Sequence, residues 1–204
     1  ILTKKILKWY DINKRSLPWR KKVYPKKKQY FTLVSEFMLQ QTQVATVIPF
    51  FNRFVINLPS LRKLANVKEK KLIKLWEGLG YYSRARNLKK TAQQIVRNFN
   101  GKIPKNYDQL KSLPGIGNYT ASAIMAIAFN KPYIPLDGNI ERVLKRYLYL
   151  KKENEISKDN LLQKKTVLGI SSRSSDYAQA LMELGALICK PSNPACDQCP
   201  ISKN

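Results

Sequence analysis

The 204-residue sequence has no histidine, and it has only three cysteines, eight glycines and 13 acidic residues. Without histidine, a zinc site would need thiolates as all four of its ligands. The few glycines, with no low-complexity tract and no internal repeat, indicate an ordinary globular chain of one large or two small domains. No apolar run approaches the roughly 20 residues that cross a bilayer, and no basic-then-apolar leader opens the chain. We therefore expect a cytoplasmic protein that does not associate with membranes.

Because acidic residues are few, the charge balance is strongly basic. The chain has 38 lysines and arginines, which gives a formal net charge of +25. Such an excess attracts phosphates and predicts salt-sensitive binding to a polyanion. A lysine-rich proteome is an alternative source of part of this charge. We expect a monomer that works on the chromosome as a nucleoid-associated protein.

Apolar residues recur at helical spacing, and no stretch shows the alternation of a strand. We therefore predict an all-α fold, in which Pro49 ends or kinks a helix and residues 151–158 form a polar connector. The predicted helices cover residues 2–13, 31–47, 50–56, 60–64, 68–75, 83–99, 108–112, 118–129, 140–148, 158–165 and 175–189.

Two glycines interrupt the helical pattern in the stretch Leu113-Pro114-Gly115-Ile116-Gly117. They predict a tight turn between two helices that residues with a Cβ would resist. Backbone N–H groups at such a turn, followed by a helix N-terminus, can bind a phosphate. The alternative is a helix–turn–helix corner that only packs.

About twenty residues after this turn comes Leu136-Asp137-Gly138-Asn139, at the start of another helix. Asp and Asn are good N-cap residues, so a structural cap is one role open to Asp137. Together, the glycine turn and the acid resemble the helix–hairpin–helix, Gly/Pro, Asp signature of a DNA glycosylase superfamily. The hairpin alone also occurs in proteins that merely hold DNA, so Asp137 distinguishes an enzyme from a binding module.

Glu36 is the only acid between Asp11 and Glu69, in a predicted helix of apolar residues and amides. Such surroundings disfavour the ionised carboxylate, which suits a general acid near neutral pH. A capping or salt-bridged Glu near the first turn is the alternative.

Aromatic and basic residues occur together at two further places. Trp19 and Arg20 follow Leu17-Pro18, and a basic surface loop is predicted from Lys21 to Lys28. In Gly78-Leu79-Gly80-Tyr81-Tyr82-Ser83-Arg84-Ala85-Arg86, two tyrosines follow a glycine turn beside two arginines. Aromatics on a tight turn can wedge between bases while arginines contact phosphates. A loop anchored by a buried Trp and a packed Tyr corner are the alternatives.

The three cysteines lie in the last sixteen residues as Cys189-x6-Cys196-x2-Cys199. In a cytosolic protein, clustered cysteines favour a metal over disulfides. Four thiolates suit either zinc or an iron–sulfur cluster. The superfamily pattern has a fourth cysteine six positions further on, so we expect that ligand at position 205, just beyond Asn204.

These segments together resemble the catalytic portion of the MutY-type A/G-specific adenine DNA glycosylases over essentially the whole chain. The resemblance implies a six-helix barrel lobe (29–134) with the hairpin and a [4Fe-4S] cluster lobe (1–28 and 135–204), with double-stranded DNA between them. It also implies removal of adenine mispaired with 8-oxoguanine or guanine. A C-terminal lobe that recognises 8-oxoguanine in the family is expected to lie outside this chain.

The resemblance further implies roles for individual residues. Glu36 would protonate adenine N7 and help to activate water, and Asp137 would stabilise the oxocarbenium-like sugar. Tyr119 and Asn139 would assist at the sugar and at Asp137. Gln41 and Tyr81 would fill the space left by the flipped base. The remaining expected contacts are Arg84, Arg86, Gly115 and Gly117 to DNA, Trp19, Arg20 and Gln179 to adenine, and Cys189, Cys196 and Cys199 to the cluster.

Two alternative functions remain to be separated from this one. An endonuclease III-like pyrimidine glycosylase and lyase would have a Schiff-base lysine at the position of Tyr119, so we predict a monofunctional glycosylase. A catalytically silent DNA-binding protein has no need of both Glu36 and Asp137. The segment between Arg20 and Tyr30 is longer and more basic than the usual connector of the family.

Overall fold

The computed structural model describes residues 2–150 and 157–202, and these residues form helices and no strand. The predicted all-α fold is therefore confirmed. Residues 151–156 of the predicted polar connector lie outside the described residues. Within the described ranges, no helix combines the length and the apolar character that a membrane crossing requires. In chain order the elements are α1 (Leu2–Asn13), η1 (Pro18–Arg20), α2 (Pro25–Leu39), α3 (Val44–Asn57), α4 (Leu61–Ala65), α5 (Glu69–Trp76), α6 (Ser83–Asn98), α7 (Tyr107–Lys111), α8 (Asn118–Ala123), η2 (Ile124–Ala128), α9 (Gly138–Tyr147), α10 (Lys158–Lys164), η4 (Lys165–Leu168), α11 (Ser174–Glu183), η5 (Leu184–Ile188) and η6 (Cys196–Gln198).

The boundaries predicted around Pro49 are wrong. Helix α2 begins at Pro25 and ends at Leu39, and α3 runs without interruption from Val44 to Asn57. Proline is favoured at the first helical position, where its missing N–H costs nothing, so half of the predicted basic loop is helical. Pro49 removes one donor from α3 but does not end it, because the helix buries an apolar face formed by Val47, Phe51 and Phe54.

The chain divides into two compact units, each described here by itself. The first contains residues up to Arg15 and from Asn130 onward, and the second contains Ser16–Phe129. The predicted lobe boundaries, at 28/29 and 134/135, stay predictions and differ from this division, which falls at 15/16 and 129/130. Residues 16–28 belong to the second unit because η1 packs on α2 and α3, where the Trp19 ring lies edge-on to Phe51 at 5.3 Å.

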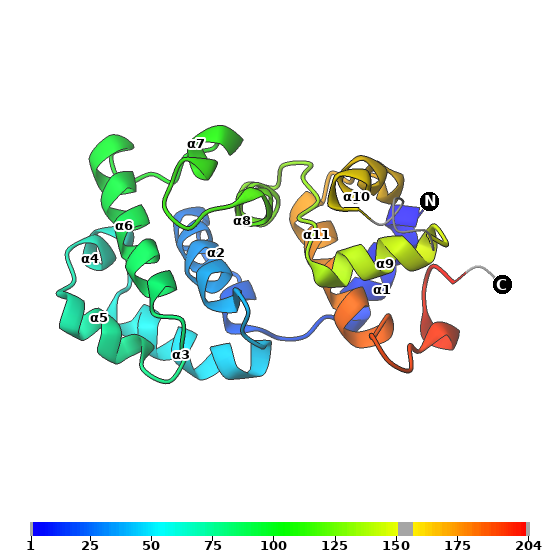
Figure 1. Ribbon diagram of the computed structural model, residues 1–204, viewed down its shortest axis with the longest axis horizontal. Helices are drawn as coiled ribbons and strands as arrows, with labels where there is room; N and C mark the ends of the chain where they lie inside the picture. Colours follow the sequence, from blue (N-terminus) through cyan, green and yellow to red (C-terminus); the bar gives the residue numbers. More distant parts are fainter. Residues whose placement is uncertain (1, 151–156, 203–204) are drawn as a thin grey trace. The chain divides into compact units, whose positions relative to one another are not determined.

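In the first unit, the two ends of the chain meet. Helix α1 packs against α11, as Figure 1 shows. At its end, Arg15 donates two hydrogen bonds of 2.8 and 2.7 Å to the fully buried carboxylate of Glu183. Such a bidentate pair leaves no oxygen of the buried acid without a charged donor. The core of this unit includes Ile6, Tyr10, Ile140, Leu144, Tyr177, Leu181 and Leu184.

In the second unit, α2 lies at the centre and contacts α3, α6, α8, η1 and η2. Every residue of α2 from Tyr30 to Met38 is buried, so this helix is enclosed on all sides. Edge-to-face contacts join Phe31 to Phe51 and Phe54 to Trp76, with ring centroids 5.2 and 5.9 Å apart. Helix α4 packs on α6 at the other side of the unit. The buried α2 therefore fixes the segments that lead into and out of it.

Gly185 is required by a close approach of η5 to the start of α9. A Cβ at this position would lie 2.6 Å from the Cβ of Asn139 and 2.9 Å from its carbonyl oxygen. We expect Gly185→Ala to lower the free energy of unfolding by roughly 1–3 kcal/mol, since one backbone must move. Gly138→Ala is the matched control, because a Cβ there meets nothing within 4 Å. Thermal unfolding of both variants checks this; equal Tm values would contradict it.

Candidate functional site

Asp137 forms the N-cap of α9. Its Oδ1 accepts a hydrogen bond of 2.7 Å from the Ile140 N–H, and its Oδ2 accepts one of 3.2 Å from the Asn139 side-chain amide. Burial raises the pKa of Asp137 above its ordinary value, although these hydrogen bonds act in the opposite direction. The N-cap alternative is therefore correct as geometry. This cap is half-buried rather than fully exposed.

Arg142 connects this acid to the first cysteine. Its Nη2 donates to Asn139 Oδ1 at 2.7 Å and to the Gly185 carbonyl at 2.8 Å, and its Nε donates to the Cys189 carbonyl at 2.6 Å. Sequence reasoning missed this residue. The signal was its position three residues after Asn139, which places both side chains on one face of α9.

Glu36 is only 4% exposed and lies in the last turn of α2. The alternative of a cap in the first turn is wrong, because the helix begins at Pro25 rather than at Phe31. Burial and the carbonyl end of a helix both disfavour a carboxylate as an anion. Glu36 is therefore a buried carboxyl group near the carbonyl end of a helix.

Gln41 and Tyr81 both have left-handed backbone conformations. Their φ angles are +56° and +45°, which are uncommon for residues other than glycine. Gln41 is exposed in the turn between α2 and α3, and Tyr81 is 63% exposed in the turn before α6. Strained turns of this kind persist only where surrounding contacts impose them. Both residues predicted to fill the space of a flipped base are thus presented to solvent on tight turns.

The two arginines after this turn have different surroundings. Arg86 is exposed at the surface, where its Nε contacts Glu69 Oε1 at 2.8 Å. Arg84 is only 6% exposed, and its guanidinium donates to backbone carbonyls of the same unit. The prediction that Arg84 contacts a phosphate is therefore corrected, because its donors are directed into the protein.

The predicted hairpin connects α7 to α8. Gly115 has φ +77°, and a Cβ there would lie 2.8 Å from the Phe37 ring and 2.9 Å from Asn87 Cβ. Gly117 has φ −91° and open space around it, so the expectation that both glycines are required holds for Gly115 alone. Thr91 Oγ1 donates to the Pro114 carbonyl at 2.7 Å and fixes the turn to α6.

The remaining predicted residues are divided between the two units. Trp19, Arg20 and Tyr119 are half-buried in the second unit, together with Glu36 and the hairpin. Gln179 is buried in α11 of the first unit, which also holds Asp137, and its side-chain amide donates to the Ser175 carbonyl at 2.9 Å. Each unit therefore supplies one of the two predicted catalytic acids.

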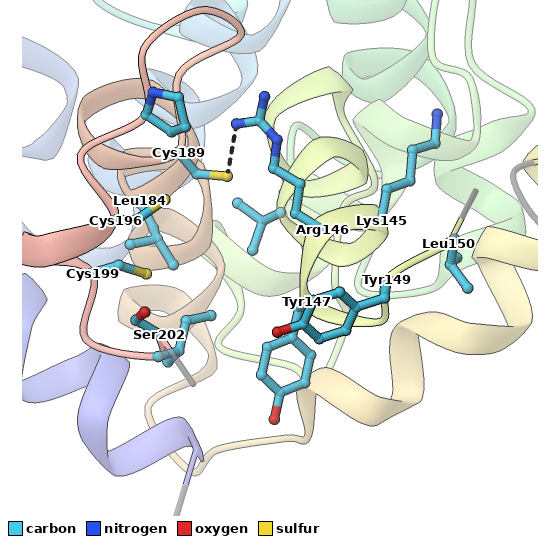
Figure 2. Close-up of a pocket in the computed structure, with 13 residues that line it drawn as sticks. Lys145, Arg146, Tyr147, Tyr149, Leu150, Leu184, Cys189, Cys196, Cys199 and Ser202 are labelled. Carbon is cyan, nitrogen blue, oxygen red and sulfur yellow. Dashed lines mark hydrogen bonds between the residues drawn. The ribbon is translucent and has the colours of Figure 1, made fainter. Parts of the chain in front are cut away.

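The three cysteines line one cavity of about 530 Å³ in the first unit. Figure 2 shows them along one wall, facing Tyr147 and Arg146 from α9, and Arg146 contacts the Cys189 sulfur at 3.5 Å. Arg146 also donates to the Lys190 and Pro191 carbonyls at 2.6 and 2.9 Å, which holds the loop after Cys189.

In the described part of the chain, no three His, Cys, Asp or Glu side chains converge on one metal ion. In a polynuclear cluster each thiolate binds a different iron, so its ligands line a cavity. The geometry of the donors therefore fits an iron–sulfur cluster.

Comparison with known families agrees with this geometry. Residues 34–166 match the HhH-GPD superfamily of base excision DNA repair proteins, which is more than half of the chain. Residues 189–203, which include all three cysteines, match the iron–sulfur binding domain of endonuclease III. The predicted cluster is thus supported as an iron–sulfur group.

Two curated relatives are adenine DNA glycosylases. The chain is 43% identical over 199 residues to the one from Buchnera aphidicola subsp. Baizongia pistaciae, covering 96% of this chain and 55% of the relative. It is 42% identical over 203 residues to the one from Rattus norvegicus, covering 96% and 39%. The chain therefore spans about half of the length of these relatives or less. The predicted resemblance to the MutY-type glycosylases is confirmed.

Solved structures confirm the fold. A thermostable thymine-DNA glycosylase superposes with a TM-score of 0.82 at 27% identity, covering 97% of this chain and 90% of that chain. A non-covalent endonuclease III–DNA complex gives a TM-score of 0.77 at 24% identity, covering 98% and 89%. The predicted helix–hairpin–helix glycosylase fold is therefore correct.

Because the pKa of Asp137 is raised in the folded protein, its proton stabilises the folded state. This contribution is complete below the ordinary Asp range near about pH 4 and is lost as the pH rises through the folded pKa. Asp137→Asn removes the titration and retains a good N-cap residue. We expect the Tm of this variant minus the Tm of the parent to become more positive as the pH rises from about 4 to neutral.

Asp11→Asn is the control with the opposite sign. The hydrogen bond from Arg173 holds the pKa of Asp11 below its ordinary value, so its ionised form stabilises the fold. The Tm of that variant, relative to the parent, should fall as the pH rises to about 4, where Asp11 ionises in the unfolded chain, and should then stay constant up to neutral pH. Parallel behaviour of the two variants would contradict the assignment of a raised pKa to Asp137.

Proposed function

Because the chain belongs to the HhH-GPD superfamily of base excision DNA repair proteins, we propose that it is the catalytic part of a monofunctional adenine DNA glycosylase. Its substrate is double-stranded DNA containing adenine opposite 8-oxoguanine or guanine, and the reaction hydrolyses the N-glycosidic bond. The single observation that carries this proposal is the half-buried Asp137 carboxylate, held at the N-terminus of α9 by hydrogen bonds from Ile140 and Asn139, with a raised pKa. Relatives named adenine DNA glycosylases support the choice of base.

Glu36 and Asp137 have different roles in the proposed reaction. Glu36, buried in α2, donates a proton to adenine N7 and so makes the base a better leaving group. Asp137, ionised, stabilises the positive charge that develops on the sugar, and its hydrogen bonds from Ile140 and Asn139 keep an oxygen oriented. Tyr119 assists at the sugar. Water then adds to the sugar carbon, and no amine of the protein is consumed.

Residues of the second unit contact the DNA. Gln41 and Tyr81 enter the space left when adenine is flipped out. Arg86 and the backbone of Gly115 and Gly117 contact phosphates, supported by the net charge of +25. Trp19 and Arg20 contact the extruded adenine, as does Gln179 of the first unit. The protein acts as a monomer and works on the chromosome.

The iron–sulfur group is proposed to be a [4Fe-4S] cluster. Cys189, Cys196 and Cys199 would hold three of its irons. When bound, the group supplies a rigid inorganic core that fixes the cysteine loop rather than a reacting centre. Arg146 holds the carbonyls of that loop from α9.

Single-turnover cleavage of a duplex with adenine opposite 8-oxoguanine, with and without hot alkali, tests the catalytic proposal. We expect strand breaks only after alkali, since no Schiff base forms. Glu36→Gln should lower the rate roughly 10²- to 10⁴-fold, the usual contribution of a general acid. Asp137→Asn should lower it roughly 10²- to 10³-fold, as loss of a charge-stabilising group does.

Glu141→Gln is the matched control for the change in charge. Glu141 is a partly exposed acid on α9 whose Oε2 lies 3.9 Å from Lys145 Nζ, and its rate should remain near that of the parent. Strand breaks without alkali, together with borohydride trapping on abasic DNA, would indicate an endonuclease III-like lyase instead. Tight binding without adenine release would indicate a silent DNA-binding protein.

The cluster proposal is tested by iron and sulfide analysis of the purified protein. Cys196→Ser should lower the bound iron and the Tm together, because the loop loses its fixed core. Ser192→Ala, in the same exposed loop but without a thiolate, should change neither. Iron content unaffected by Cys196→Ser would contradict the assignment of this ligand.

A further inference from the structure

Arg84 is a buried cation whose acceptors are backbone carbonyls of two different turns. We propose that Arg84 is a positioning residue that fixes the turns of Gln41 and Tyr81 as one rigid wedge for base expulsion. The expulsion step rests on the function proposed above. The rigid connection itself concerns the protein alone and can be tested without DNA.

One side of the guanidinium serves the turn of Gln41. Nη1 donates to the Met38 carbonyl at 2.7 Å, to the Phe37 carbonyl at 3.4 Å, and to the Gln40 carbonyl. The last carbonyls of a helix receive no hydrogen bond from a backbone N–H of the same helix. A cation at this end can donate to them instead. The chain then turns at Gln41 with φ +56°. Arg84 therefore stabilises the end of α2 from which Gln41 projects.

The other side of the guanidinium serves the turn of Tyr81. Nη2 donates to the Leu79 and Gly80 carbonyls at 3.1 and 3.2 Å. The guanidinium carbon also lies 5.5 Å from the centre of the Tyr81 ring, within the range of a cation–π contact. Trp76 Nε1 donates to the same Gly80 carbonyl at 3.1 Å. The strained conformation of Tyr81 is thus fixed from two sides.

Because each terminal nitrogen donates to a different turn, this position requires an arginine. A planar guanidinium presents its donors in a fixed fork and can bridge two turns, whereas a lysine presents one point charge. Burial lowers the pKa of Arg84, yet a guanidinium stays charged in proteins. Loss of the fork therefore leaves carbonyls of at least one turn without their donor.

The connection extends to the hairpin. Gln40, directly before the strained residue, donates through Nε2 to the Gly115 carbonyl at 3.2 Å and to Thr120 Oγ1 at 3.4 Å. The turn of Gln41 is therefore joined to Arg84 on one side and to the hairpin on the other. A wedge held in this way loses little conformational entropy when it enters a base stack, so more of its binding energy remains for expulsion.

The first measurement is amide hydrogen exchange of the whole protein without DNA. In Arg84→Lys, exchange in residues 39–43 and 79–83 should accelerate together, by roughly tenfold, the worth of one hydrogen bond to a charged group. Arg86→Lys is the matched control, since its exposed side chain contacts Glu69 rather than these turns. Both turns should then exchange as in the parent. Acceleration in one turn only, or in neither, would overturn the proposed connection.

The second measurement uses DNA with 2-aminopurine in place of the target adenine. Arg84→Lys should reduce the fluorescence increase that accompanies unstacking. The same substitution should cause a smaller reduction in a Tyr81→Ala background, because the two residues are coupled. Arg84→Met should leave the slope of log K against log salt unchanged, whereas Arg86→Met should reduce it by about 1. A reduced slope for Arg84→Met would show a phosphate contact and overturn the proposal.

The two proposals fail separately. If the parent protein unstacks no base and releases no adenine, the proposed glycosylase function fails. Hydrogen exchange in the free protein still decides whether Arg84 holds both turns. If Arg84→Met does not fold, Arg84→Lys, which retains the charge and much of the length, supplies both readouts.

Discussion

The carbonyl and N–H groups at helix ends are the constraint on which this structure depends. An all-helical chain with short connections has many such groups without partners inside the helix. Here the side chains that satisfy them are the same ones that define the candidate site. Asp137 accepts from the first turn of α9, Arg84 donates to the last carbonyls of α2, and Arg142 donates to carbonyls at η5 and Cys189. Structural support and function are therefore carried by the same residues.

At Asp137, this double role lowers the stability of the fold. A cap at the surface would stabilise the helix at neutral pH without penalty, but this carboxylate is half-buried and its pKa is raised. Part of the stabilisation from the cap is thus offset by the loss of hydration. A developing positive charge on a sugar would be stabilised strongly by an anion in such surroundings, because little water screens it. The burial that weakens the fold is the feature that makes the acid useful.

The sequence predicted the helical class, the family and most helix positions because helical spacing and the Leu-Pro-Gly-Ile-Gly and Asp137 motifs are local signals. It failed where tertiary packing decides the outcome. Pro49 lies inside α3 because an apolar face is buried around it, and Trp19 belongs with Phe51 rather than with the cluster lobe. Arg142 was missed because its acceptors include carbonyls more than forty residues away. Its spacing from Asn139 indicates only the local contact, and no local pattern indicates the distant ones.

Arg84 and Arg86 show that the net charge of a protein does not reveal which of its basic residues can contact DNA. Both were expected at phosphates, yet residues two apart on a helix lie on nearly opposite faces, so one of the pair faces the interior when the other faces solvent. With only 13 acids in the chain, a buried arginine has few carboxylates to pair with, and backbone carbonyls take their place. In this strongly basic protein, the position of a cation on its helix therefore decides whether it meets DNA or holds the surface that does.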